Sequence, residues 1–259
     1  MRGCTFPGPY LQSPEGFDTW TSPTEIVSSG QFMFLAGSRL SVAGGVSSVT
    51  VYSSTEHIAV EQVKLAEQQR VFGIIPNFFV SYDRNAVPLT TKLKYSLAVK
   101  AAIDPVTFVG VGFMAGIYQV AEAPDYVLGA KGYGQRMGAF YANAASDIVI
   151  GGAVLPSLLR QDPRYFYQGT GTKTSRALHA LSSPFVCRGD NGRLQPNYSS
   201  IGGDLASGGI SNLYYPQSNR GLDLVFRNTL VTTGVRMVNA LLQEFFLRRF
   251  TPTARNRKD

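Results

Sequence analysis

Apolar and polar residues alternate with different periods in the two parts of this chain, and the change falls near residue 70. Residues 31–54 are rich in Val, Phe, Ser and Thr. Within them, Val49 and Val51 alternate with more polar neighbours, the period of two expected for a half-buried strand. Two strands of this kind do not make a stable sheet alone. We therefore predict that residues 1–69 are a short β remnant and a linker.

From about residue 90 the apolar residues recur at three- and four-residue steps, which is the helical period. Asp104-Pro105 is expected to end or kink the first helix. The predicted helical segments are 89–105, 105–121, 133–160, 175–185, 201–215 and 222–250. The fold class is therefore mainly α: a compact, glycine-rich multi-helix bundle over residues 70–250, preceded by the β remnant. Residues 251–259 are predicted to be a basic disordered tail.

Small residues recur at four-residue steps inside the predicted helices. Glycine in a helix costs about 1 kcal/mol relative to alanine, so repeated glycines require a compensating gain. Close approach of two helix backbones supplies that gain, both in membranes and in tight soluble bundles. The residues predicted to pack helices in this way are Gly112, Gly116, Gly134, Gly138, Ala142, Gly203 and Ser207.

The lengths and charges of the helices bear on membrane contact. A spanning helix needs about 20 apolar residues, and the uncharged segment 105–121 has 17 residues that include Thr107 and Gln119. Asp147 interrupts the next candidate helix. We therefore expect a bundle that docks on a membrane. A membrane-inserted oligomeric assembly, serving as a pore or scaffold, is the alternative.

Charge is low and unevenly placed. Only 16% of the residues are charged, against about a quarter in ordinary soluble domains. Residues 1–70 hold six acids and four bases, whereas residues 71–259 hold eleven acids and twenty bases. A basic region can meet anionic lipid or nucleic acid. Outside the C-terminal tail the basic residues do not cluster, so nucleic acid is not an expected partner.

The densest cluster of polar and aromatic side chains is LLRQDPRYFYQG, residues 158–169. An aspartate followed by a proline, here Asp162 and Pro163, is typical of an N-cap and the first turn of a helix. We therefore favour a structural role, in which one helix ends near Arg160 and another begins. In the alternative, the two arginines bind an anionic group in a site made of Arg160, Asp162, Arg164 and Tyr165.

Three polar residues of the segment 133–160, namely Arg136, Asn143 and Asp147, lie at offsets that return to one helix face. Such a face lines a buried ion pair or faces solvent. We favour the solvent-facing arrangement.

Catalytic motifs are not found in the sequence. There is no GxSxG, HExxH, P-loop or CxxC pattern, and Cys4 and Cys187 lack metal-ligand spacing. Asp190 is the single acidic residue of the turn 187–200, which is too few for a calcium loop. His179 is expected to be a packing residue. We predict no catalytic residue, no metal site and no cofactor. A hydrolase or polymer-binding protein that uses Asp162, Arg164 and Tyr165 is the second alternative.

Several motifs together resemble a family of uncharacterised bacterial envelope proteins. They are RVFGIIPNFFVSYD (70–83), DPVTFVGVGFMAGI (104–117), VLPSLLRQDPRYFYQGTG (154–171) and GGISNLYYPQSNRGL (208–222). The resemblance covers about residues 45–250. In longer members, a carboxypeptidase regulatory-like β-sandwich module precedes the glycine-rich helical domain, and VSSVTVYSSTEHIAVEQV (46–63) is similar to its last strand and linker.

The resemblance implies a location and no reaction. It places the protein in the cell envelope, periplasmic or associated with the outer membrane, and assigns no catalytic residue. Residues 1–69 would be a partial carboxypeptidase regulatory-like module, so we expect a fragment or a mis-started reading frame. The predicted function is non-enzymatic, structural or interaction-based, at the membrane. The expected partners are a membrane surface, an envelope protein or further copies of this chain.

Overall fold

The computed structural model describes residues 55–83 and 86–251, and before them only the backbone of four short strands. These strands pair antiparallel: β1 (Leu11–Gln12) with β2 (Trp20–Thr21), and β3 (Ser38–Ser41) with β4 (Ser48–Val51). Leu40 lies opposite Val49, so the strand predicted from the alternation of Val49 and Val51 is present as β4. Cys4 and the residues after 251 lie outside the described part.

The described chain is mainly helical, as the periodicity predicts. The helices are α1 (Thr55–Gln68), α2 (Thr91–Ala102), α3 (Pro105–Val120), α4 (Gly129–Val149), α5 (Leu155–Leu158), α6 (Lys173–Ser182), α7 (Tyr198–Ser211) and α8 (Leu222–Phe245). A π-helical segment, η1 (Ile150–Val154), joins α4 to α5, and short 3₁₀ turns are η2 (Gln217–Asn219) and η3 (Leu247–Phe250). The remaining strands are β5 (Arg70–Val71), β6 (Ile75–Pro76), β7 (Val80–Ser81), β8 (Tyr165–Phe166), β9 (Val186–Arg188) and β10 (Leu194–Pro196).

The junction between α2 and α3 shows how local sequence sets these boundaries. Asp104 caps α3, accepting a hydrogen bond from the Val106 amide at 2.9 Å, and Pro105 occupies the first turn. Proline lacks an N–H and cannot continue α2, but it is favoured at the start of a helix. The two helices consequently meet at an angle of 49°.

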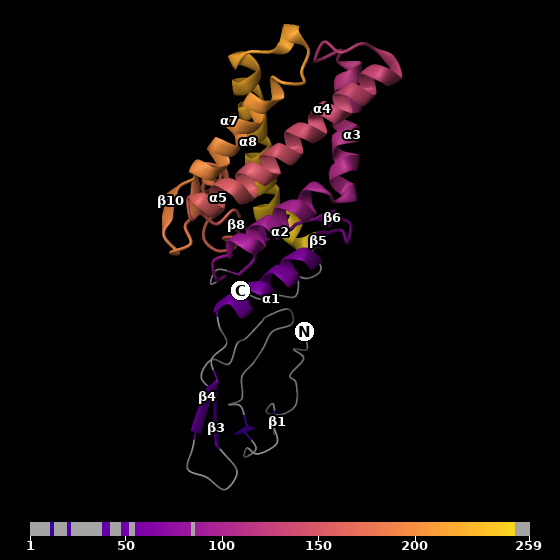
Figure 1. Ribbon diagram of the computed structural model, residues 1–259. Helices are drawn as coiled ribbons and strands as arrows, with labels where there is room; N and C mark the ends of the chain where they lie inside the picture. Colours follow the sequence, from indigo (N-terminus) through magenta and orange to yellow (C-terminus); the bar gives the residue numbers. More distant parts are fainter. Residues whose placement is uncertain are drawn as a thin grey trace.

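The long helices form one end of the molecule (Figure 1). Helix α3 packs on α4, α4 on α7, and α7 on α8. Helices α1 and α2 and strands β5, β6 and β8 lie at the other end of this helical part, where α6 packs on α8. The chain returns there after α8: the Phe250 ring stacks on Phe72 at 4.6 Å, and Thr251 is fully buried. Thr251, which the sequence assigns to the tail, is therefore part of the packed structure.

Helix α1 belongs to the core at that end. Val63 of α1 is buried together with Phe78, Leu89 and Leu97. The packed helical unit therefore includes residues from Thr55 onward, ahead of the boundary predicted at residue 70. From the sequence alone this helix is interpreted as part of the linker, because its mixed-charge face gives little sign of burial.

Polar and apolar side chains are distributed unusually over the long helices. The buried residues of α7 are Ser199, Ser200, Gly203, Asp204, Ser207, Gly208 and Ser211. Its exposed residues are Tyr198, Ile201, Leu205, Gly209 and Ile210. On α3 the exposed side chains include Val109, Phe113 and Val120, at 71%, 69% and 87% exposure. Helix α7 therefore directs small and polar residues inward, and both α3 and α7 direct large apolar residues outward.

Candidate functional site

The stretch 158–169 does not start a second helix. Helix α5 ends at Leu158, Arg160 adopts a left-handed φ of 53°, and the chain continues as strand β8, parallel to β7. The Tyr165 amide donates to the Phe79 carbonyl at 2.8 Å, and the Tyr167 amide to Ser81 at 2.9 Å. The predicted helix start at Asp162-Pro163 is therefore wrong, because pairing with β7 satisfies these amides instead.

Asp162 and Arg164 bind each other inside the protein. The Asp162 carboxylate accepts from the Arg164 amide at 3.0 Å, from Nε at 2.9 Å and from Nη2 at 2.7 Å. Both side chains are almost fully buried, and Arg164 Nη2 also donates to the Val87 carbonyl. Because Arg164 Nε and Nη2 are used internally and the guanidinium is paired with Asp162, its arrangement favours a structural role over binding of an anionic ligand. Arg160 is exposed and separate from this pair.

Tyr165 makes its polar contact with Glu244, a residue that sequence reasoning did not select. The buried Glu244 carboxylate accepts from Tyr165 Oη at 2.7 Å, from the Gly169 amide at 2.8 Å and from Arg176 Nε at 2.8 Å. The sequence does carry one signal for Glu244: glutamate is rare in residues 71–259, which contain only two. The carboxylate joins β8 and α6 to the end of α8.

Electrostatics at this contact follow from burial and hydrogen bonding. Burial alone would raise the pKa of Glu244, but the donors from Arg176, Tyr165 and two amides outweigh it and leave that pKa lowered. Burial, together with the neighbouring carboxylate, raises the pKa of Tyr165. Glu244 is therefore held ionised and Tyr165 neutral, which suits a structural contact and not proton exchange.

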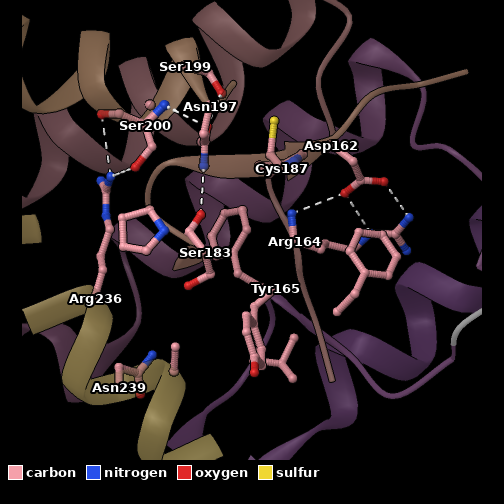
Figure 2. A pocket seen from close by; sticks show the side chains of 18 of the residues that line it. Asp162, Arg164, Tyr165, Ser183, Cys187, Asn197, Ser199, Ser200, Arg236 and Asn239 are labelled. Atoms are coloured by element: carbon pink, nitrogen blue, oxygen red, sulfur yellow. Dashed lines mark hydrogen bonds and ion pairs between the residues drawn. The ribbon is translucent and has the colours of Figure 1, made fainter. Parts of the chain in front are cut away.

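A cavity of about 440 Å³ lies between β7, β8, the loop before β9, and helices α7 and α8 (Figure 2). Its wall is mixed, and the lining includes aromatic residues such as Tyr165 as well as polar residues such as Asp162 and Arg236. Arg236 of α8 and Ser200 of α7 stand close together at its polar end, where the guanidinium donates to the serine hydroxyl. The lining there includes Asp147, Gly151, Ser199, Ser200, Arg236 and Asn239.

Arg236 also holds two aspartates. Its Nη2 donates to the two Asp147 carboxylate oxygens at 2.8 and 2.7 Å and lies 3.0 Å from Asp204 Oδ1. The π-helical segment η1, a feature common at functional sites, follows directly after α4, the helix that carries Asp147. The cluster therefore ties α4, α7 and α8 together beside the cavity.

The solvent-facing arrangement favoured for the Arg136–Asp147 face is wrong. Arg136 is fully buried and donates to four backbone carbonyls in residues 123–127 and to the Gln119 side chain. Asn143 binds the Tyr215 hydroxyl at 2.8 Å, and Asp147 is paired with Arg236. The helix face is buried because α7 and the 121–128 loop cover it, which a single-helix pattern does not reveal.

The predicted packing residues divide into two groups. Gly203 lies against Gly151, and the hydroxyls of Ser207 and Ser146 are 3.0 Å apart. Gly112 contacts the Tyr133 hydroxyl. A methyl group at Gly116, Gly134 or Gly138, in contrast, would meet no atom of the described chain within 4 Å. Ala142 is half-buried in α4. Packing of the three open glycines against another chain stays a prediction.

The remaining candidates have structural contacts. The two carboxylate oxygens of Asp190 accept hydrogen bonds from Lys94 Nζ at 2.9 and 2.8 Å. His179 Nε2 lies 2.8 Å from the Phe166 carbonyl oxygen. Burial raises the pKa of the Cys187 thiol to about 11, with further contributions from nearby Asp162 and Asp190. Among the described residues, no group of three or more His, Cys, Asp or Glu is arranged to hold a metal ion.

Within the described chain, one helical stretch is long and apolar enough to cross a membrane. It is Gly129–Leu158, with a mean hydropathy of 1.3, and the bent pair α2–α3 would add a second if it counts as one span. Buried core helices of soluble proteins pass the same test of length and hydropathy. In this stretch only 11% of the apolar 18-residue part is buried inside the protein.

Comparisons with protein-family models, curated proteins and solved structures find no match to this chain.

Proposed function

We propose that this chain is a non-enzymatic protein of the cell envelope whose long helices are embedded in a membrane, where it has a structural or interaction role. Helices α3, α4 and α7 and residues 228–242 of α8 would form the embedded part. The end that carries α1, α2, α6 and the short strands would lie outside the lipid. The location in the envelope rests on the family resemblance.

The observation that carries the proposal of insertion is the reversed arrangement of α7. Its buried side is made of serine, glycine and aspartate, and its exposed side of Ile, Leu, Tyr and Gly. In water this arrangement leaves the apolar surface unburied, so the hydrophobic effect would not favour it. In lipid the polar residues face the bundle interior, as they do in membrane proteins.

Helix α8 supports the same proposal. Its exposed residues include Phe226, Leu230, Val235 and Val238, whereas Thr233 and Arg236 turn inward to Asp204. Its 24 residues rise about 36 Å at 1.5 Å per residue, enough for a hydrocarbon core of about 30 Å.

Fractionation tests insertion directly. Membranes that contain the full chain are washed with high salt and then with alkaline carbonate, and the pellet is extracted with detergent. We expect the protein to stay in the pellet through both washes and to enter solution with detergent. Release by salt or carbonate would contradict insertion and leave peripheral docking.

A pair of substitutions distinguishes a lipid-facing surface from a water-facing one. Val235→Glu places a charge on the apolar surface in the middle of α8 and should sharply reduce the carbonate-resistant fraction. Leu222→Glu is the matched control, because Leu222 is also exposed but lies beside Asp223 at the end of the helix. Equal recovery of both variants would contradict the proposal.

A further inference from the structure

Asp147, Asp204 and Arg236 form a charge cluster that is not balanced. The Arg236 guanidinium contacts both carboxylates through the same nitrogen, Nη2. When both aspartates are ionised, the three side chains carry a net charge of −1. The Asp204 side chain is only 1% exposed, and an excess charge buried to this degree is costly unless it is neutralised.

The hydrogen bonds show where the imbalance lies. Asp204 Oδ2 accepts from the Thr233 hydroxyl at 3.1 Å. Asp204 Oδ1 is buried and accepts no hydrogen bond from the described residues, although Arg236 Nη2 is 3.0 Å away. The hydrogen bonds of that nitrogen go to Asp147. One buried carboxylate oxygen is therefore left without a donor.

We propose that Asp147, Asp204 and Arg236 form a proton-binding site, in which Asp204 Oδ1 takes up one proton while Asp147 keeps the ion pair with Arg236. The added O–H bond removes the excess charge and turns the unpaired acceptor into a hydroxyl. Two carboxylates that share one site do not both ionise readily, which favours protonation of one of them.

A proton fits the cluster better than a metal ion does. The site offers two carboxylates and a guanidinium, and the guanidinium occupies the space where a cation would sit. Oxygen-ligated metals take six or more ligands, and no group of three metal-ligating side chains occurs among the described residues. Asp147 and Arg236 line the cavity of Figure 2, which gives a path for water and protons to the cluster.

The charged and polar groups around Asp204 come from each packed element. Helix α4 supplies Asp147, and α8 supplies Arg236 and Thr233. The segment η1 supplies the backbone of Gly151, next to Gly203. The proposal stands on this geometry, and it holds whether or not the bundle is inserted in a membrane.

Infrared spectroscopy of the folded full chain tests the site, because the carbonyl stretch of a protonated carboxylic acid is separate from that of a carboxylate. The spectra are recorded from about pH 4 to about pH 9. We expect a protonated-acid band that persists well above about pH 3.9, where an exposed aspartate loses its proton. Asp204→Asn should abolish this band, and Asp223→Asn, at an exposed position of α8, should leave it.

Two further variants keep the test decisive if Asp204→Asn fails to fold. Asp147→Asn leaves Arg236 to Asp204 alone, so the band should disappear at a lower pH than in the parent. Thr233→Val removes the donor to Asp204 Oδ2, so the band should persist to a higher pH. Parent, Asp147→Asn and Thr233→Val chains with the same titration, or a parent without the band above about pH 5, would overturn the proposal.

Discussion

Gly203 and Gly151 bring α7 and the π-helical segment η1 into backbone contact. A Cβ placed on Gly203 would lie 2.5 Å from the Gly151 Cα and 2.9 Å from its amide nitrogen. Both are backbone atoms, so no flexible side chain can move aside. This contact is where the Asp147–Arg236–Asp204 cluster is assembled.

We expect Gly203→Ala to destabilise the protein by about 1–3 kcal/mol, the usual cost of overpacking. Gly138→Ala is the matched control, because the position is helical and open. Alanine there should be neutral or stabilise the helix by up to about 1 kcal/mol. Thermal or denaturant unfolding of both variants gives the comparison, and an equal effect would argue against the close contact.

Open glycines also allow a test of self-association. If Gly134 and Gly138 pack against a second copy, Gly138→Leu should leave the monomer folded and reduce the oligomer measured by cross-linking in membranes. Gly234→Leu, at another open glycine on α8, is the control. An unchanged oligomer, or no oligomer in the parent, would remove these glycines from the interface.

Removal of the Glu244 carboxylate should be costly. Glu244→Ala leaves Arg176, the Tyr165 hydroxyl and two amides without their acceptor, and loss of one partner of a buried ion pair typically costs about 3–5 kcal/mol. Glu122→Ala is the control, because the other glutamate of this region is exposed and should change stability by less than about 0.5 kcal/mol. Urea unfolding measures both.

Acid should weaken the same contact. Because the pKa of Glu244 is lowered in the folded chain, the unfolded chain binds the proton more readily and stability rises with pH. The contribution is fully present above about pH 4.3, the ordinary glutamate value, and is lost as pH falls through the folded value. Glu244→Gln should show a smaller loss of stability in acid than the parent does.

Cys187 should react slowly with alkylating agents. Its pKa is raised from 9.0 to about 11, so the thiolate that reacts is about a hundredfold scarcer at neutral pH. In a Cys4→Ser background, which leaves one thiol, modification of the folded chain should be at least that much slower than in denaturant. Equal rates would show that the thiol is accessible.

Truncations locate the start of the helical unit. A chain that begins at Thr55 retains Val63 in the core with Phe78, Leu89 and Leu97, and should melt within a few degrees of the full chain. A chain that begins at residue 70 loses that contact and should melt at a lower temperature. Circular dichroism checks both, and equal melting temperatures would place α1 outside the core.

The sequence predicts the helices because their apolar periods and end signals are local. Asp104 and Pro105 are adjacent, and their roles as cap and first-turn residue need no distant partner. The site is different, because its contacts join residues far apart in the chain. Tyr165 and Glu244 are 79 positions apart, and Asp147 and Arg236 are 89.

The misplaced helix start at Asp162 has the same cause. Locally, Asp162 and Pro163 favour a cap, but β7 offers carbonyls that only the folded chain brings near. Arg136 shows the reverse case, in which a charged residue expected at the surface is buried by carbonyls of a nearby loop. Spacing identifies which residues share a helix face, but not what covers that face.

The reversed helix α7 has a consequence for how the chain can change during evolution. In most water-soluble proteins, exposed positions accept almost any polar residue and buried ones exchange among large apolar types. Here Ile201, Leu205 and Ile210 should exchange freely with one another, but not with charged residues. Ser199, Ser207 and Ser211 should tolerate only residues of similar size, because the neighbouring helices leave no room for more. In related chains, the exposed positions of α7 should therefore vary among large apolar residues, and its buried positions should keep small polar residues.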